Sequence, residues 1–104
     1  MKAAVVQTRT PATSKAGLAH VAPLIRAAAA QGAALIVTPE GTNFLQRDRS
    51  LMALELKSAG DDPCVQGLIA LAAELGVHIV IGSALVRGAG GAAANRQLVI
   101  GPDG

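Results

Sequence analysis

Apolar and polar positions along the first 40 residues predict a strand, a helix and a second strand. Residues 3–7 and 35–37 are apolar runs with little polar alternation, which is the pattern of strands buried on both faces of a parallel sheet. Between them, apolar side chains recur at helical spacing over residues 18–29, and Gly32 stands where a left-handed residue would end that helix. A strand–helix–strand unit of this kind indicates an α/β fold with a right-handed crossover.

The helix in this unit contains one conflicting residue. Ser14 is a candidate cap, but Pro23 lies in mid-helix, where proline removes a backbone hydrogen bond and costs about 3 kcal/mol. We therefore expect a kink at Pro23, or a helix that restarts near Val21.

The second half of the chain predicts two further helices and two further strands. Asp62 and Pro63 give a strong start signal, because an acidic cap is followed by proline at the first helical position, and Gly76 ends the same helix. The other expected elements are a weakly periodic helix over residues 45–56, strands over residues 77–85 and 96–100, and a glycine-rich loop between those strands. Residues 101–104 give a turn signal with no strand after it, so we expect the sequence to be cut short there.

The second strand leads into the best candidate for a catalytic group. Pro39 has no N–H to donate and biases Thr38 toward extended geometry, so the strand should stop there and present Glu40 at its carboxyl end. Open α/β sheets bind their ligands at that edge. Glu40 is therefore predicted to be a partly buried catalytic carboxylate, and the alternative is a solvated loop acid.

Composition narrows the possible function classes. With 104 residues, of which 51% are hydrophobic and 15% charged, the chain suits one globular domain with a sizeable core. Phe44 is the only aromatic residue and the net charge of +2 is spread along the chain, so nucleic-acid binding is not expected. The N-terminus does not resemble a signal peptide and no run of about 18 apolar residues occurs, which predicts a cytoplasmic protein without membrane contact.

Cysteine, histidine and glycine positions give no further strong motif. Cys64 is the only cysteine, which rules out an internal disulfide and a cysteine-based metal cluster, and we expect no metal and no cofactor. Cys64 also lies on the apolar stripe of its helix, so burial is expected rather than nucleophilic chemistry, and His20 and His78 are isolated. The run from Gly88 to Ala93 fits the loose dinucleotide-binding pattern G-x-G-x-x-A, but lacks the helix and the acid that should follow it.

Four stretches of the chain carry a family resemblance. They are the opening strand at residues 3–7, the run from residue 28 to Glu40 with its Pro-Glu motif, the segment 72–82 and the segment 95–104. Together they resemble the nitrilase superfamily of carbon–nitrogen hydrolases, specifically its Nit-like amidase branch. The resemblance implies the N-terminal part of a nitrilase-type α-β-β-α sandwich, in which about four strands carry helices on one face and a second sheet packs on the other. Residues 1–104 would cover less than half of that domain.

The resemblance also implies a Glu-Lys-Cys catalytic triad, of which this chain carries only the general base, Glu40. The family's lysine and cysteine fall beyond the turn at residues 101–104, and no lysine or cysteine of this chain occupies a matching position. Phe44 and Arg47 are candidate substrate-binding residues. Phe44 either lines a pocket or packs in the core, whereas Arg47, together with Arg49, either recognises a substrate carboxylate or is simply solvated.

In full-length form the expected enzyme hydrolyses non-peptide carbon–nitrogen bonds in a small amide or nitrile, and residues 1–104 alone are expected to be inactive. Two alternatives stay open, namely a non-catalytic binding or assembly module derived from the same fold and, more weakly, a dinucleotide-binding domain. Without a second sheet an apolar surface would be exposed, so a homo-oligomer is expected as well. The strand residues expected on that surface include Val5, Ile36, Val80 and Val99.

Overall fold

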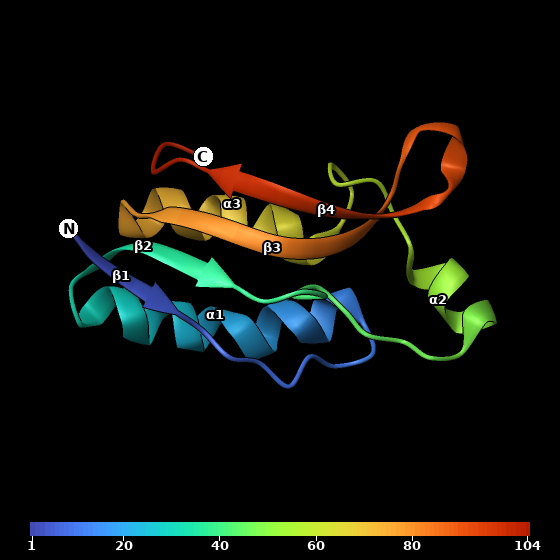
Figure 1. The fold of residues 1–104 in the computed structure, drawn as a ribbon, viewed down its shortest axis with the longest axis horizontal. Helices are drawn as coiled ribbons and strands as arrows, with labels where there is room; N and C mark the ends of the chain where they lie inside the picture. The colour runs from blue at the N-terminus through green and yellow to red at the C-terminus, as the bar shows by residue number, and fades with distance from the viewer.

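Four strands and three α-helices make up the chain, and the computed structural model describes all of residues 1–104 (Figure 1). In chain order the elements are β1 (Lys2–Val5), α1 (Ser14–Ala30), β2 (Ala33–Thr38), α2 (Arg49–Glu55), α3 (Pro63–Leu75), β3 (His78–Arg87), a 3-10 turn (Ala89–Gly91) and β4 (Ala93–Ile100). The strands form one sheet in the order β1-β2-β3-β4, in which β1, β2 and β3 are parallel and β4 is antiparallel to β3. The α/β fold predicted from the sequence is confirmed.

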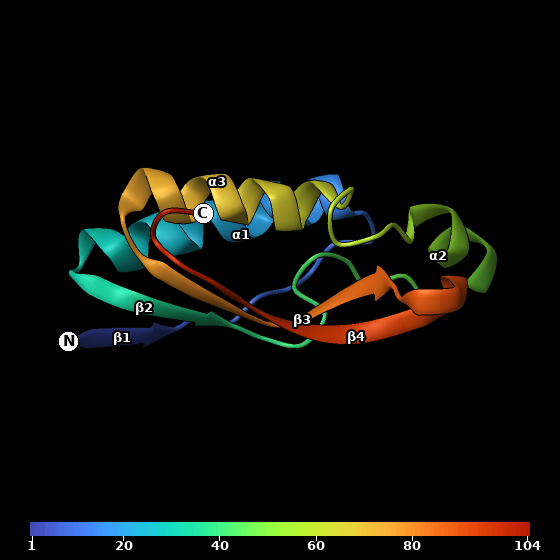
Figure 2. The ribbon, with the colours of Figure 1, turned by 90° about the horizontal axis from the view of Figure 1, so that it is seen from above.

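The two faces of the sheet differ, because α1 and α3 cover one face and leave the other open (Figure 2). A cross-strand row on the helix side is at most 6% exposed and consists of Ile36, Ile79 and Ile100. The adjacent row lies on the open face and consists of Val5, Val37, Val80 and Val99, of which Val5 is 79% and Val99 72% exposed. The prediction for Ile36 is therefore wrong, since successive strand residues point to opposite faces and Ile36 points to the helices.

The longest helix, α1, runs through Pro23 as a single element. Pro23 is exposed, while Val21 and Ile25 are fully buried against the sheet, so packing holds both halves of the helix in place. The restart expected near Val21 therefore does not occur. Gly32 follows the helix with φ of 92°, the left-handed conformation predicted for it. None of the helices is both long enough and apolar enough to cross a bilayer.

Side-chain caps fix where α1 and α3 begin. Thr13, rather than Ser14, caps α1, because its hydroxyl accepts a hydrogen bond from the backbone N–H of the third residue after it. Asp62 caps α3, with Pro63 as the first helical residue, and Gly76 ends the helix with φ of 66°. The predicted signals for α3 are thus confirmed at both ends.

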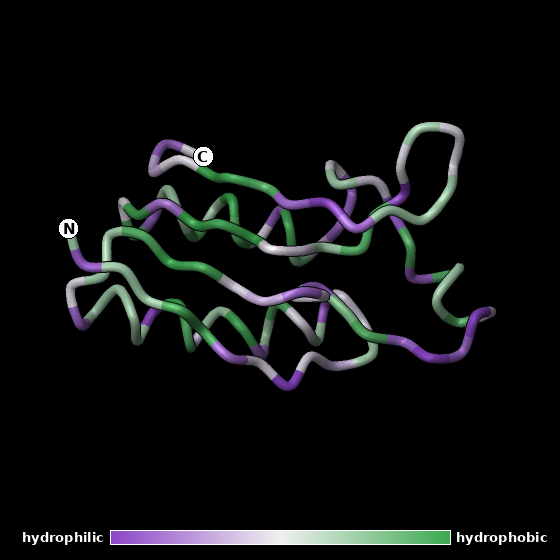
Figure 3. The backbone as a smooth tube through the Cα atoms, viewed as in Figure 1, coloured by the Kyte–Doolittle hydropathy of each residue, from purple (hydrophilic) through white to green (hydrophobic).

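The predicted helix over residues 45–56 is shorter in the structure. Asp48 caps α2, whose first residue is Arg49, and none of its residues is buried. The hydrophilic stretch that leads into α2 lies at one end of the molecule (Figure 3). Arg47 therefore lies in the preceding loop rather than in the helix.

The glycine-rich loop joins β3 and β4 as an antiparallel hairpin. It contains the 3-10 turn, with Gly90 at φ of 77°, and β4 then begins at Ala93, before the predicted start at residue 96. A dinucleotide site of the expected type needs a helix N-terminus behind the loop to bind phosphates. A strand stands there instead, so the dinucleotide-binding alternative is overturned.

Candidate functional site

Glu40 lies two residues beyond the end of β2, at the edge where the parallel strands β1 and β2 both end. This position agrees with the prediction, but the residue is exposed rather than partly buried. The exposure has a local cause. Gly41 adopts φ of 65°, which turns the chain back onto β3 and leaves Glu40 on the outside of the turn.

Ser83 on β3 fixes the backbone on both sides of Glu40. Its N–H donates to the Pro39 carbonyl at 3.0 Å, and its carbonyl accepts from the Thr42 N–H at 2.8 Å. Its hydroxyl accepts a longer hydrogen bond of 3.4 Å from the Gly41 N–H. The loop that follows β2 therefore continues to pair with β3 after β2 itself has ended.

Two threonines close the inner side of this turn. Thr38 and Thr42 are each 1% exposed, and the Thr42 hydroxyl lies 2.8 Å from the Thr38 hydroxyl. The Thr42 hydroxyl also donates to the Pro39 carbonyl. Side-chain and backbone hydrogen bonds thus hold the peptide groups around Glu40, whereas the Glu40 side chain itself is exposed.

Asn43 is the most extensively bonded residue of the loop, and it is completely buried. Its side-chain amide pairs with both backbone groups of Leu85, because Nδ2 donates to the Leu85 carbonyl at 2.8 Å and Oδ1 accepts from the Leu85 N–H at 2.8 Å. Nδ2 also donates to Oδ1 of Asp62 at 3.0 Å. Asn43 therefore links the Glu40 loop to β3 and to the start of α3.

Asp62 joins this network to α1 and α3. Its Oδ2 accepts from the Ser14 hydroxyl at 2.8 Å and from the Val65 N–H at 2.9 Å, and its side chain is fully buried. The Ser14 hydroxyl in turn accepts from the Cys64 N–H at 3.1 Å. The sequence identified Asp62 only as a cap and gave no sign of Asn43, because their contacts join residues 19 to 48 positions apart.

Phe44 and Arg47, the other predicted site residues, do not reach Glu40 through any hydrogen bond or ion pair. Phe44 is 0% exposed, which favours the core alternative over the pocket alternative. Arg47 and Arg49 are exposed, and the one salt bridge of the chain joins Arg26 to Glu74 instead.

Cys64 is unsuited to nucleophilic chemistry. It is 1% exposed, as predicted. Burial, together with the nearby charge of Asp62, raises the pKa of the Cys64 thiol from 9.0 to about 12. Lys2 donates to the Gln31 carbonyl and Lys57 to the Glu55 carbonyl. No hydrogen bond or ion pair joins Glu40 to Cys64 or to any of the three lysines.

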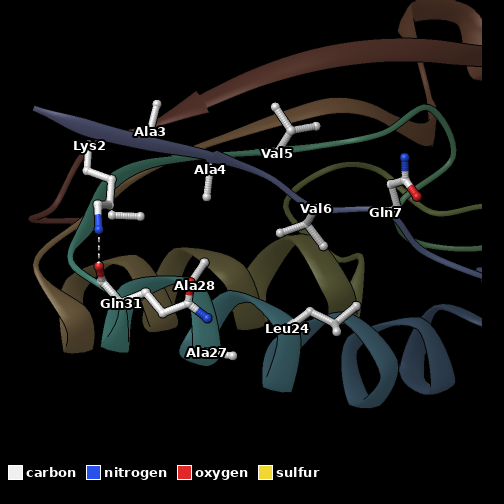
Figure 4. A pocket seen from close by; sticks show the side chains of 11 residues that line it. Lys2, Ala3, Ala4, Val5, Val6, Gln7, Leu24, Ala27, Ala28 and Gln31 are labelled. Atoms are coloured by element: carbon white, nitrogen blue, oxygen red, sulfur yellow. Dashed lines mark hydrogen bonds between the residues drawn. The ribbon is translucent and has the colours of Figure 1, made fainter.

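The two grooves on the surface lie at the sheet edges and not at Glu40. One, of about 340 Å³, lies between β1 and α1 and is lined by residues such as Val6, Leu24 and Ala28 (Figure 4). The other, of about 390 Å³, lies between α3 and β4 and includes Ile69 and Leu98. Both grooves occur where an edge strand meets the helix layer, so their position reflects the unpaired edges of the sheet. Glu40, at the end of β2, is therefore the better guide to function.

A family model described as carbon-nitrogen hydrolase matches residues 2–104. The NitFhit protein of C. elegans is similar in structure, with a TM-score of 0.80 and 16% identity over 95% of this chain and 24% of that one. An amidase from Nesterenkonia sp. gives a TM-score of 0.69 and 19% identity over 95% of this chain and 38% of that one. XC1258 of Xanthomonas campestris, a CN-hydrolase superfamily protein with an arsenic adduct in its active site, gives a TM-score of 0.67 and 21% identity over 95% of this chain and 36% of that one. No curated protein matches the chain significantly.

At these identities the solved structures show the fold alone. They match nearly all of this chain, yet the chain spans only 24–38% of their length. The predicted sheet with helices on one face therefore agrees with part of a larger known architecture.

Proposed function

Because the chain belongs to the carbon-nitrogen hydrolase family, we propose that it contributes the general base, Glu40, to an enzyme that hydrolyses non-peptide carbon–nitrogen bonds. The observation that carries the proposal is a carboxylate at the carboxyl edge of a parallel sheet, on a turn whose flanking peptide groups are both bonded to Ser83. The exposure of the side chain also fits the alternative of a solvated loop acid, and the Glu40→Gln test below separates the two. The substrate class is a small amide or nitrile.

In this mechanism Glu40 takes the proton from a cysteine thiol, which then attacks the amide or nitrile carbon. A free thiol with a pKa near 8.5 and a carboxylate near 4.3 differ by about 4 units, or about 5.7 kcal/mol against proton transfer. A lysine close to the reacting atoms would lower this barrier by stabilising the thiolate and the developing oxyanion. For an amide, the glutamate gives this proton to the departing amine, and a thioester on the cysteine remains. Water then attacks the thioester, which releases the acid product and regenerates the thiol.

We further propose that the lysine and the cysteine lie outside residues 1–104, in the remainder of a carbon–nitrogen hydrolase domain of which this chain is the N-terminal part. The buried, raised-pKa thiol of Cys64 supports this division. In that domain a second sheet would cover the open face, and the predicted cytoplasmic location and homo-oligomeric state belong to the same proposal. Residues 1–104 alone should then hydrolyse neither amides nor nitriles.

The test uses the complete gene product that carries residues 1–104 and measures ammonia release from simple aliphatic amides and nitriles. Glu40→Gln should lower kcat by about 10²- to 10⁴-fold, the usual contribution of a general base. Glu74→Gln is the matched control, because Glu74 is an exposed glutamate that pairs with Arg26 on α1. Turnover that survives Glu40→Gln at the level of the control would refute the role of Glu40.

The remaining alternative is a non-catalytic binding or assembly module. This alternative would keep the fold and the hydrogen-bonded turn around Glu40 without using Glu40 as a base. A complete gene product that folds, binds an amide without turning it over and lacks a further reactive cysteine would support this alternative over the enzyme.

A further inference from the structure

We infer that Asn43 is a positioning residue for Glu40, whose buried amide locks the loop after β2 onto β3 and α3. The inference rests on the proposed function, because it explains how a base on an exposed turn keeps a defined place. Asn43 itself would touch neither the substrate nor the reacting atoms.

The first argument is that Asn43 replaces a missing stretch of strand. β2 ends at Thr38, whereas β3 continues to Arg87, so the second half of β3 lacks a strand partner on that side. The Asn43 amide offers Leu85 one donor and one acceptor, each at 2.8 Å, as a paired strand residue would. The loop therefore stays in register with β3 on both sides of its turn.

The second argument is that the loop is held from three further directions. On the side of α1, an ideal Cβ at Gly17 would lie 1.9 Å from the Asn43 carbonyl oxygen, so α1 and the loop backbone are in direct contact. At its far end, the Leu45 N–H donates to the Pro11 carbonyl at 2.9 Å. At its side, Asp62 accepts from the second Asn43 amide hydrogen. A shift of the loop in any of these directions breaks a buried contact.

The third argument is chemical. A general base must lie within hydrogen-bond reach of the proton it removes, and a misplacement of about 1 Å costs roughly 10²-fold in rate. Because the exposed Glu40 side chain makes no hydrogen bond or ion pair, its place depends on the backbone that carries it. Ser83 fixes the peptide groups beside Glu40, and Asn43 fixes the segment that keeps them on Ser83.

Asn43→Ala and Asn43→Ser in the complete gene product test the inference. Asn43→Ser removes the paired bonds to Leu85 but keeps a hydroxyl for the buried polar neighbours, so it serves if Asn43→Ala does not fold. The control is Ile25→Val, which shortens a fully buried side chain in the second half of α1 and lowers stability without removing a hydrogen bond of the loop. We expect either Asn43 variant to lower kcat about 10²-fold with KM changed less than about threefold, while Ile25→Val leaves both unchanged.

A second readout does not depend on turnover. Amide hydrogen exchange at Gly41 and Leu85, and the carboxyl NMR signal of Glu40, should change in the Asn43 variants and not in Ile25→Val. If these signals stay fixed, or if kcat falls no more than in the control, the positioning role is wrong. If the wild type turns over no amide or nitrile yet these signals change, the proposed function fails while the role of Asn43 in holding Glu40 stands.

Discussion

A single methyl group added at Gly17 should destabilise this fold, although it replaces a glycine inside a helix. The new Cβ would lie 1.9 Å from the Asn43 carbonyl oxygen and 2.9 Å from the carbonyl carbon. Both obstacles are backbone atoms, so no change of side-chain rotamer relieves the clash. The loop must move by at least 1.1 Å to bring the shorter distance to 3.0 Å, below which real Cβ contacts essentially do not occur.

Two opposing terms set the size of the effect. Alanine is favoured over glycine in a helix interior by about 1 kcal/mol. Overpacking costs about 1–3 kcal/mol. A loop displaced by more than about 1 Å also breaks the hydrogen bonds of the buried Asn43 amide, and an unsatisfied buried group costs about 1–3 kcal/mol. We therefore expect Gly17→Ala to lower the free energy of unfolding by about 2 kcal/mol net, which corresponds to a Tm lower by roughly 10 °C.

Gly67→Ala is the matched control, because Gly67 also lies inside a helix with a close neighbour. Its ideal Cβ would be 2.4 Å from Cδ2 of Leu18, which is the end of a flexible side chain and can move aside. Urea denaturation followed by circular dichroism should show a change of no more than about 1 kcal/mol for Gly67→Ala. If Gly17→Ala is as stable as the wild type and the Asn43 amide signals do not move, the close contact between α1 and the loop is not a constraint.

Three further perturbations follow from burial and charge. Cys64 should resist alkylation at neutral pH, because burial raises the pKa of its thiol. Since that pKa is higher in the folded than in the unfolded chain, the free energy of unfolding should hold below pH 9.0 and fall toward pH 12, and urea titrations of Cys64→Ala should lack this fall. The hydrogen bond from Arg26 lowers the pKa of Glu74, so carboxyl NMR titration should show the midpoint of Glu74 rising in Arg26→Gln, with no measurable change in stability because the pair is exposed. Val99→Lys on the open face should reduce self-association of residues 1–104 in size-exclusion chromatography, and unchanged association would show that this face is not the contact.

The features that the sequence predicted well are those with a local cause. Asp62, Pro63 and Gly76 act within one helix, so their residue types alone define where α3 begins and ends. Pro39 ends β2 for an equally local reason, which placed Glu40 at the correct edge of the sheet. The α/β class follows from such segments, because their apolar spacing requires each to pack on the others.

The features that the sequence missed depend on contacts between distant segments. Residues 45–48 form a loop instead of the start of the predicted helix, and there the Leu45 N–H bonds to Pro11, a contact that has no pattern in the local sequence. Asn43 finds Leu85 across 42 positions. The hydroxyl and backbone of Ser83 likewise meet the Glu40 turn from more than 40 positions away.

Within residues 1–104 the buried polar groups are all paired, whereas part of the apolar surface of the sheet stays exposed. Every buried side-chain nitrogen and oxygen has a hydrogen-bond partner within residues 1–104, including those of Asn43 and Asp62. The open face, by contrast, leaves Val5 and Val99 largely in water. Since unsatisfied buried polar groups are costly, a satisfied network is rigid before anything covers the apolar face. The backbone geometry around Glu40 is thus set by hydrogen bonds within residues 1–104, and it does not depend on a cover over the open face.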